Sequence, residues 1–273
     1  MQEDLEKRIK HEEELFRKNK PDESNLIELS NECLSTDVDK HTIHAILDMG
    51  HLQNVSRYIA NKNLTDVWFN ILLRLIKKSD YHVGYMLNQR SNRYRNDIAF
   101  NIINEGEIKS LSYFTLWSLV KEVGRSLSAL EQGQQKPIIG ILSHNQLNCV
   151  LVDLACLSFG YRVVPIPLNA TTEHVSFIIE HSEITHLFLG GKKGNDIWND
   201  INERPLINTI SMDKVVRSIK SLDWEQFLEI GDKSIKFDVE KQMSTVSIDA
   251  TQSIMYTSGT TDNPKGIMFN QLN

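Results

Sequence analysis

Cysteine is scarce in this sequence. Only three of the 273 residues are cysteines, Cys33, Cys149 and Cys156, which suit neither a disulfide framework nor a zinc site. Cys149 and Cys156 lie on one predicted helix, where seven residues correspond to about 10 Å, whereas the Cα atoms of a disulfide lie within about 7 Å. We therefore expect reduced thiols, which favours an intracellular protein.

The chain also has no excess of basic residues. Its 30 Lys and Arg residues are outnumbered by 36 Asp and Glu residues, and the formal net charge is −6. This balance argues against a general binder of nucleic acids or of anionic membranes, because both need a basic surface. An anionic ligand would have to be bound by local hydrogen-bond donors.

Long apolar runs are absent as well. The run 150–157 is interrupted by Asp153, and no stretch approaches the roughly 20 apolar residues of a membrane-spanning helix. Residues 1–8 are charged and lack the apolar segment of a secretory signal. We expect a cytoplasmic protein without a transmembrane segment. With 40% hydrophobic and 24% charged residues, the composition is that of a globular chain with a sizeable core.

Residues 1–64 are predicted to form a charged helical extension. Its apolar positions have helical spacing but form narrow stripes, Pro21 interrupts the first stripe, and Gly50 ends a helix expected over 37–49. A further helix is expected over 51–60. Narrow stripes suggest that this region packs on another surface. The first helix fits an exposed helix with i,i+4 charge pairs better than a partner-binding arm.

One face of the helix expected over 37–49 carries His41, His44 and Asp48. This pattern could be offered as a metal site. A metal site needs further ligands and a defined geometry, and the sequence supplies neither. A solvated polar face is the better interpretation, and we expect no metal ion on this face of the helix.

A wider apolar pattern begins at residue 65, where we place the start of the second region, 65–273. Apolar positions at helical spacing predict a core-facing helix that ends at Lys77 and Lys78, whose charges suit a helix C-terminus. The elements expected next are strands over 98–103 and 108–113, joined by a turn at 104–107, and an amphipathic helix over 116–130.

Short apolar strands then alternate with amphipathic helices. Continuously apolar strands are typical of a parallel sheet that helices cover on both faces, and right-handed crossovers should join them. The predicted fold class is therefore α/β, with parallel-sheet β-α-β-α-β layers preceded by the α-helical extension. We expect strands over 137–142, 162–166 and 184–189, helices over 147–157 and 175–179, then a helix at 197–202, a strand at 206–210, a helix at 223–230 and a polar loop at 231–250.

The segment Gly-Gly-Lys-Lys-Gly at 190–194 is rich in glycine and lysine. It follows a predicted strand, as phosphate-binding loops do, but it lacks the G-x-G-x-x-G pattern. A solvent-exposed loop is the better interpretation.

The segment 253–266 joins a strand to a hydroxyl-rich turn. Ser-Ile-Met-Tyr at 253–256 has strand composition, and Thr-Ser-Gly-Thr-Thr-Asp-Asn-Pro-Lys-Gly follows at 257–266. Backbone N–H groups of such a turn, its hydroxyls and the ammonium of Lys265 can surround the oxygens of a triphosphate. The common P-loop does not fit, because Gly266 replaces the hydroxyl residue that would hold magnesium. A plain Ser/Thr-rich surface turn is the alternative.

This segment closely resembles the motif Y-T-S-G-T-T-G-x-P-K-G of the adenylate-forming superfamily, which includes acyl-CoA synthetases, firefly luciferase and adenylation domains of peptide synthetases. Ten of the eleven positions agree, counting the free one, and Asp262 stands where the family has glycine. Two weaker resemblances lie upstream. Residues 111–116 resemble L-T-Y-x-E-L, with Thr115 in place of Glu, and 155–167 resemble A-x-x-x-A-G-A-x-x-V-P-L, with Tyr161 in place of a small residue.

The resemblance implies ATP-dependent activation of a carboxylic acid as an acyl-adenylate, followed by transfer of the acyl group to a thiol. Such chemistry depends on positioning and on neutralising phosphate charge. The implied cofactors are ATP, Mg²⁺ and coenzyme A, and a fatty acid is the favoured substrate. The resemblance assigns to the triphosphate cradle Thr257, Ser258, Gly259, Thr260, Thr261, Lys265 and Gly266.

The resemblance also implies that further apparatus follows residue 273. In the family the adenine and ribose contacts, the magnesium-binding glutamate, the acyl pocket and a lid with the catalytic lysine come later, and 266–273 resembles the entry to a helix. We therefore expect a truncated adenylation domain that holds no catalytic residue and does not turn over alone. The alternatives are an acyl-AMP ligase that serves an acyl carrier protein, and a noncatalytic nucleotide- or partner-binding fragment.

Overall fold

The computed structural model describes residues 2–20, 24–104, 106–131, 135–213, 221–233, 237–257 and 263–273. The chain divides into two compact units, Met1–Tyr81 and His82–Asn273. This division falls later than the expected boundary after residue 64. The reason is α5 (Thr65–Ser79), which buries Trp68, Ile71 and Leu75 in the core of the first unit.

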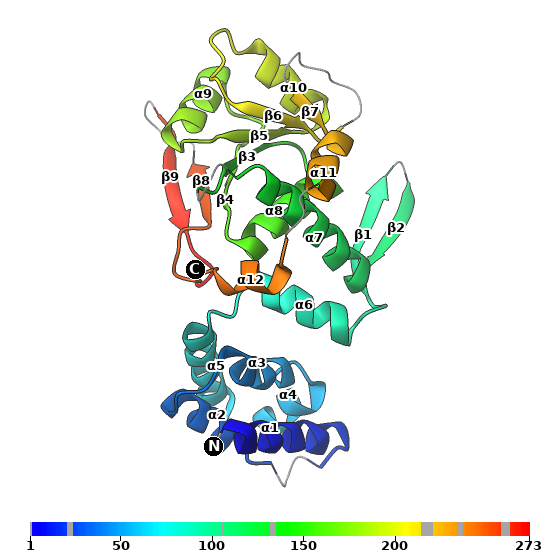
Figure 1. Cartoon of the computed structure of the whole chain (residues 1–273), viewed down its shortest axis with the longest axis vertical. Coiled ribbons are helices and arrows are strands. Elements are labelled where there is room, and N and C mark those ends of the chain that lie inside the picture. The colour runs from blue at the N-terminus through cyan, green and yellow to red at the C-terminus, as the bar shows by residue number, and fades with distance from the viewer. Residues whose placement is uncertain are drawn as a thin grey trace. The chain divides into compact units, whose positions relative to one another are not determined.

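The first unit is helical, as the sequence predicted (Figure 1). Its narrow apolar stripes pack on one another and on α5, so together they form one core. Glu12 is buried and accepts hydrogen bonds from the Ser24 hydroxyl (2.8 Å) and the Asn25 N–H (2.9 Å), which ties the first helix to the start of the second. The helices before α5 are α1 (Gln2–Arg17), α2 (Leu26–Ser35), α3 (Lys40–Met49) and α4 (Gln53–Asn61).

The polar residues on α3 form the suggested solvated face only in part, because His41 is exposed whereas Asp48 is half-buried. His44 is buried, its Nε2 lies 3.4 Å from the carbonyl oxygen of Ser79, and its ring meets Tyr81 edge-on at 5.0 Å. The Tyr81 hydroxyl donates to Asp48 at 3.1 Å. Packing by α5 and the residues after it explains the difference. The described residues hold no group of three or more His, Cys, Asp or Glu side chains that could bind a metal ion.

The second unit begins with a helix and a hairpin. The hairpin strands β1 (Ile98–Asn104) and β2 (Glu107–Ser112) are antiparallel, as predicted. The second strand ends one residue before the expected position, because the Ser112 hydroxyl accepts the Thr115 N–H and so starts the next helix. The helices on either side are α6 (Val83–Arg93), which the sequence pattern did not predict, and α7 (Tyr113–Ala129).

A largely parallel sheet forms the centre of the second unit, so the predicted α/β class is confirmed. The strand order is β7-β6-β5-β3-β4-β8-β9, and only β9 is antiparallel to its neighbour. Figure 1 shows α7, α8 and α11 over one face and α9 and α10 over the other. The strands are β3 (Ile138–Leu142), β4 (Arg162–Pro165), β5 (His186–Leu189), β6 (Asn208–Ser211), β7 (Ser221–Asp223), β8 (Ser253–Thr257) and β9 (Lys265–Phe269).

The helices of this unit agree with the expected alternation, with two corrections. The segment 190–194 is not a solvent loop: it forms the start of α10, where a Cβ on Gly190 would lie 2.1 Å from the Ser143 hydroxyl. The expected loop 231–250 contains α12, which begins where Asp238 accepts the Lys241 N–H and buries Met243. The helices are α8 (Leu147–Phe159), α9 (Thr172–His181), α10 (Gly191–Asp200), α11 (Trp224–Lys233) and α12 (Val239–Ser244).

The end of the chain is also different from the expectation. Residues 265–269 form β9 rather than the entry to a helix. Ile267, Met268 and Phe269 are residue types that suit strands, and β9 pairs with β8 over its whole length. The sheet therefore gains an edge strand, and of the expected turn 257–266 only residues 258–264 lie outside the two strands, as the segment that connects them. We call this segment the loop 258–264.

Candidate functional site

The two ends of the loop 258–264 are fixed by strand pairing. Thr257, the last residue of β8, is paired in register with Lys265, the first residue of β9. Because directly paired residues of an antiparallel pair lie on one face of the sheet, the Thr257 hydroxyl and the Lys265 side chain are neighbours at the base of the loop. Both residues are exposed, so both can reach a ligand.

Of the seven residues assigned to the cradle, three lie in the described strands and four do not. Thr257 of β8 is paired with Lys265 of β9, and Gly266 occupies the next position of β9, where it is paired with Tyr256. Ser258, Gly259, Thr260 and Thr261, together with Asp262, lie outside the described residues. The structure therefore brings Thr257 and Lys265 together and defines where the loop begins and ends.

The loop follows the carboxyl end of a parallel strand. β8 runs parallel to β4, with Val163 paired with Ser253, and the strands β3, β5 and β6 run in the same direction. Ligands of open α/β sheets bind outside the carboxyl ends of the strands. At this edge Gln146 donates to the Ser143 hydroxyl (3.0 Å), and the Gly191 N–H at the start of α10 donates to the carboxylate of Asp213.

Beneath the loop, Tyr256 fills the space between β8 and the helix α9. It is 7% exposed, and its hydroxyl contacts His181 and Ser182 at the end of that helix. Gly266 lies directly opposite it in β9, where a Cβ would come within 3.0 Å of the tyrosine Cζ. Sequence reasoning missed His181 and Ser182, because they lie about 75 positions from Tyr256 and no local pattern marks such a contact.

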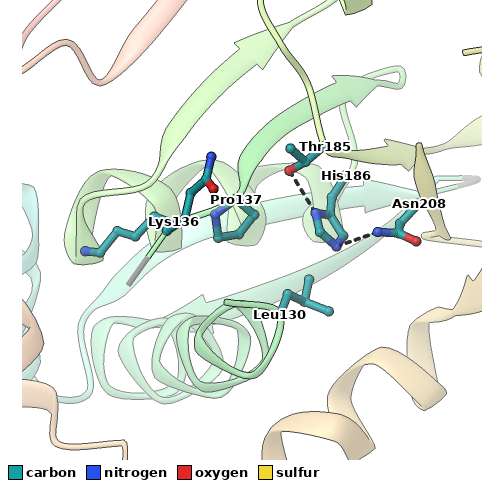
Figure 2. Close-up of a pocket in the computed structure, with 7 residues that line it drawn as sticks. Leu130, Lys136, Pro137, Thr185, His186 and Asn208 are labelled. Carbon is teal, nitrogen blue, oxygen red and sulfur yellow. Dashed lines mark hydrogen bonds between the residues drawn. The ribbon is translucent and has the colours of Figure 1, made fainter. Parts of the chain in front are cut away.

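A pocket of about 110 Å³ lies at the opposite, amino-terminal edge of the sheet (Figure 2). Its central group is His186, whose Nδ1 lies 2.9 Å from Thr185 Oγ1 and whose Nε2 lies 3.1 Å from Asn208 Nδ2. Burial lowers the pKa of His186. Both ring nitrogens are already used by neighbours, and the pocket lies away from the loop, so we do not assign it to the same site. The other lining residues are Leu130, Gln135, Lys136 and Pro137.

At the base of the loop, the described residues fit a phosphate ligand but not a metal ion. The exposed ammonium of Lys265 and the hydroxyl of Thr257 can bind phosphate oxygens. A magnesium ion prefers carboxylate oxygens and water, and the described strands place no carboxylate beside these two residues. None of the helices in the described segments combines the length and apolarity that a bilayer crossing requires.

Comparison with known proteins gives one family match. A family model described as "AMP-binding enzyme" matches residues 87–273. Long chain acyl-CoA synthetase 4 of Arabidopsis thaliana is 28% identical over 169 residues, which cover 58% of this chain and 24% of that protein. Fatty acyl-CoA synthetase A of Dictyostelium discoideum is 28% identical over 181 residues, which cover 62% of this chain and 26% of that protein. The chain thus spans about a quarter of the length of these relatives.

Solved structures share the fold of this chain at low sequence identity. An acyl-CoA synthetase of Brucella canis superposes with a TM-score of 0.56 at 14% identity, covering 70% of this chain and 33% of that one. A red-emitting luciferase of Phrixothrix hirtus superposes with a TM-score of 0.54 at 19% identity, covering 70% of this chain and 46% of that one.

Proposed function

Because this chain belongs to the AMP-binding enzyme family, we propose that it supplies the polyphosphate-binding part of an ATP-dependent carboxylic acid ligase. The observation that carries the proposal is the pairing of Thr257 with Lys265 at the carboxyl edge of a parallel sheet. This pairing places one hydroxyl and one ammonium at the base of a loop that closely resembles the family's phosphate-binding motif.

Each assigned residue has a physical role in this proposal. Lys265 neutralises charge on the β- and γ-phosphates, and the hydroxyls of Thr257, Ser258, Thr260 and Thr261 donate hydrogen bonds to phosphate oxygens. Gly259 presents its backbone N–H, and Gly266 leaves room for the Tyr256 ring. These groups hold the leaving pyrophosphate while the substrate carboxylate attacks the α-phosphate, so they act by positioning and by electrostatics.

The substrate and the acceptor belong to the same proposal. The names of the relatives, long chain and fatty acyl-CoA synthetases, support a fatty acid as the acid and coenzyme A as the thiol. We further propose that the magnesium ligand and the acyl pocket follow residue 273, that the adenylation domain corresponds to the unit His82–Asn273 rather than to all of 65–273, and that the protein is cytoplasmic. The chain by itself is expected to be inactive.

The decisive experiment is ATP–pyrophosphate exchange by the full-length translation product, with fatty, aryl and amino acids as substrates. We expect exchange with at least one fatty acid. Lys265→Ala should weaken ATP binding by about 1.5–3 kcal/mol, the contribution of a hydrogen bond to a charged group. Lys241→Ala, which removes an exposed lysine of α12, is the matched control and should leave binding unchanged.

The full-length product also distinguishes the proposed acid–CoA ligase from an acyl-AMP ligase and from a noncatalytic protein. Formation of acyl-CoA supports the proposed acceptor, whereas transfer only to an acyl carrier protein identifies an acyl-AMP ligase. Absence of exchange with every acid, together with equal ATP binding by the wild type and Lys265→Ala, leaves a noncatalytic partner-binding protein and rejects the enzyme.

A further inference from the structure

Tyr256 is buried, whereas the next residue of β8, Thr257, is exposed, because successive side chains of a strand point to opposite faces of the sheet. The Tyr256 side chain crosses from β8 to the C-terminal end of α9. There its hydroxyl lies 2.6 Å from His181 Nδ1 and 2.8 Å from Ser182 Oγ. A tyrosine hydroxyl has one proton and two acceptor sites, so both contacts can be hydrogen bonds at once.

The two partners of Tyr256 are held in place by α9. The His181 ring stacks on Phe177, one turn earlier, at 5.1 Å with 22° between the planes. The same ring meets the ring of Tyr256 edge-on at 5.9 Å. Ser182 is buried and its N–H donates to the Ile178 carbonyl at 3.0 Å. The position of the tyrosine hydroxyl is therefore set by the helix end.

Gly266 extends this arrangement to the second strand. It lies opposite Tyr256, directly after Lys265, and a Cβ there would lie 3.0 Å from Cζ and 3.2 Å from the hydroxyl oxygen of the tyrosine. The ring of Tyr256 thus packs against the backbone of β9 next to the lysine. One side chain contacts both strands at the base of the loop and the end of α9.

We propose that Tyr256, held by His181 and Ser182, is a positioning residue that fixes the strand ends bearing Thr257 and Lys265 for polyphosphate binding. The proposal rests on the proposed nucleotide function of the loop 258–264. With the two strand ends held, the Thr257 hydroxyl and the Lys265 ammonium start from the geometry that the ligand needs, so less conformational freedom is lost on binding. His181 and Ser182 act through Tyr256 and do not touch the nucleotide.

The test compares variants of the full-length translation product by calorimetric titration with ATP. Tyr256→Phe keeps the ring and removes the hydroxyl, and His181→Leu removes the ring nitrogen. Each should raise the dissociation constant for ATP about tenfold, or about 1.4 kcal/mol. The double variant should bind ATP no more weakly than either single variant, because both substitutions remove the same contact, the one between the Tyr256 hydroxyl and His181. His181→Asn restores a polar atom near the position of Nδ1 and should bind within about threefold of the wild type.

A purely structural role would give a different result. It would lower the melting temperature while the folded variants kept the affinity of the wild type for ATP, and that outcome overturns the proposal. His174→Leu, on the same helix, is the matched control and should not change the affinity. If His181→Leu does not fold, the ATP affinities of Tyr256→Phe and His181→Asn decide between a positioning role and a purely structural role.

Lys265→Ala separates the proposed nucleotide binding from the proposed positioning role of Tyr256. If Lys265→Ala loses ATP binding while Tyr256→Phe and His181→Leu bind as the wild type does, the loop binds nucleotide and the positioning role is wrong. If neither the wild type nor any variant binds ATP, the proposed function and the positioning role both fail.

Discussion

The ring of Phe159 in α8 lies so close to Gly124 in α7 that a Cβ on the glycine would be 2.2 Å from Cε2 and 2.3 Å from Cδ2. Phe159 is fully buried, and it also stacks on Trp117 at 5.9 Å. A buried ring in a close-packed core can move aside only by displacing its neighbours. Two of the helices that cover this face of the sheet, α7 and α8, therefore meet at a point where only a hydrogen atom fits.

We expect Gly124→Ala to destabilise the second unit. Alanine gains about 1 kcal/mol of helix propensity, but forced overpacking against a fixed ring costs about 1–3 kcal/mol or more at this separation. Overpacking should therefore win, which urea unfolding would measure. Phe159→Leu removes the clashing ring atoms, so the double variant should be more stable than the sum of the two single changes. Additive effects would contradict the close contact.

Asp262→Gly should tighten ATP binding. The substitution restores the residue that the family motif has and removes a negative charge near the expected phosphates. The gain should be about 0.5–1 kcal/mol in physiological salt, since an exposed charge is largely screened. Titration with ATP at low and high salt measures it. Asp262→Asn separates the two causes, because it removes the charge and leaves the side chain. Equal affinity of all three proteins at low salt would show that Asp262 lies away from the phosphates.

His186 should make the second unit less stable in acid. The Thr185 hydroxyl donates to the Ile138 carbonyl (3.2 Å) and so accepts from His186 Nδ1, which leaves Nε2 to accept from Asn208. Protonation of Nε2 removes that acceptor. Because burial lowers the pKa of His186 in the folded state, the stability it contributes is present above its ordinary pKa of about 6.5 and is lost as the pH falls below it.

The measurement is the free energy of unfolding between pH 7.5 and about 5, where a normal histidine titrates. His186→Gln should flatten the pH dependence of stability relative to the wild type. If the free energy of unfolding of His186→Gln depended on pH as steeply as that of the wild type, other groups would be the cause of the acid sensitivity.

The three cysteines should be unreactive in the folded protein. Burial raises the pKa of Cys33 and of Cys149 to about 11, and that of the fully buried Cys156 well above its usual value. Thiols with such pKa values should react with a disulfide reagent at pH 8 about a hundredfold more slowly than in urea, because the thiolate is the nucleophile. Rapid modification of one thiol before unfolding would contradict this.

The raised pKa values of the cysteines also predict how the stability of the protein changes at alkaline pH. A thiol whose pKa is raised on folding keeps its proton longer than in the unfolded chain. Its contribution to stability is therefore complete below about pH 8.5 and is lost as the pH rises toward 11. Replacement of all three cysteines by alanine or serine should reduce this loss, which unfolding at pH 7 and pH 10 would measure.

The centre of the fold was predictable because local signals agreed with one another. Apolar runs marked β3, β4 and β5, helical stripes marked the helices between them, and Gly160 ends α8 with φ of 74°, a conformation that glycine adopts readily. The phosphate-binding loop was predicted because an eleven-position motif follows residues of strand composition, and it stays a prediction. These features depend on neighbours in the sequence.

The remaining features depend on contacts that a single sequence does not display. The apolar face of α5 has the same width whichever core it enters, so its membership of the first unit was not visible. Residues 265–269 are too few for periodicity to separate strand from helix, and only pairing with β8 decides. The contact of Tyr256 with His181 joins residues 75 positions apart.

The strand order also sets the sequence of events during synthesis. β8 is inserted beside β4, although the helices and strands α9 to α12 lie between them in the chain. Strands β3 to β7 can therefore associate before residues 253–269 are available, and β8 and β9 then join a sheet that already exists. The hairpin that carries Thr257 and Lys265 is completed after these strands, so a nascent chain brings the two residues together only once the scaffold has formed.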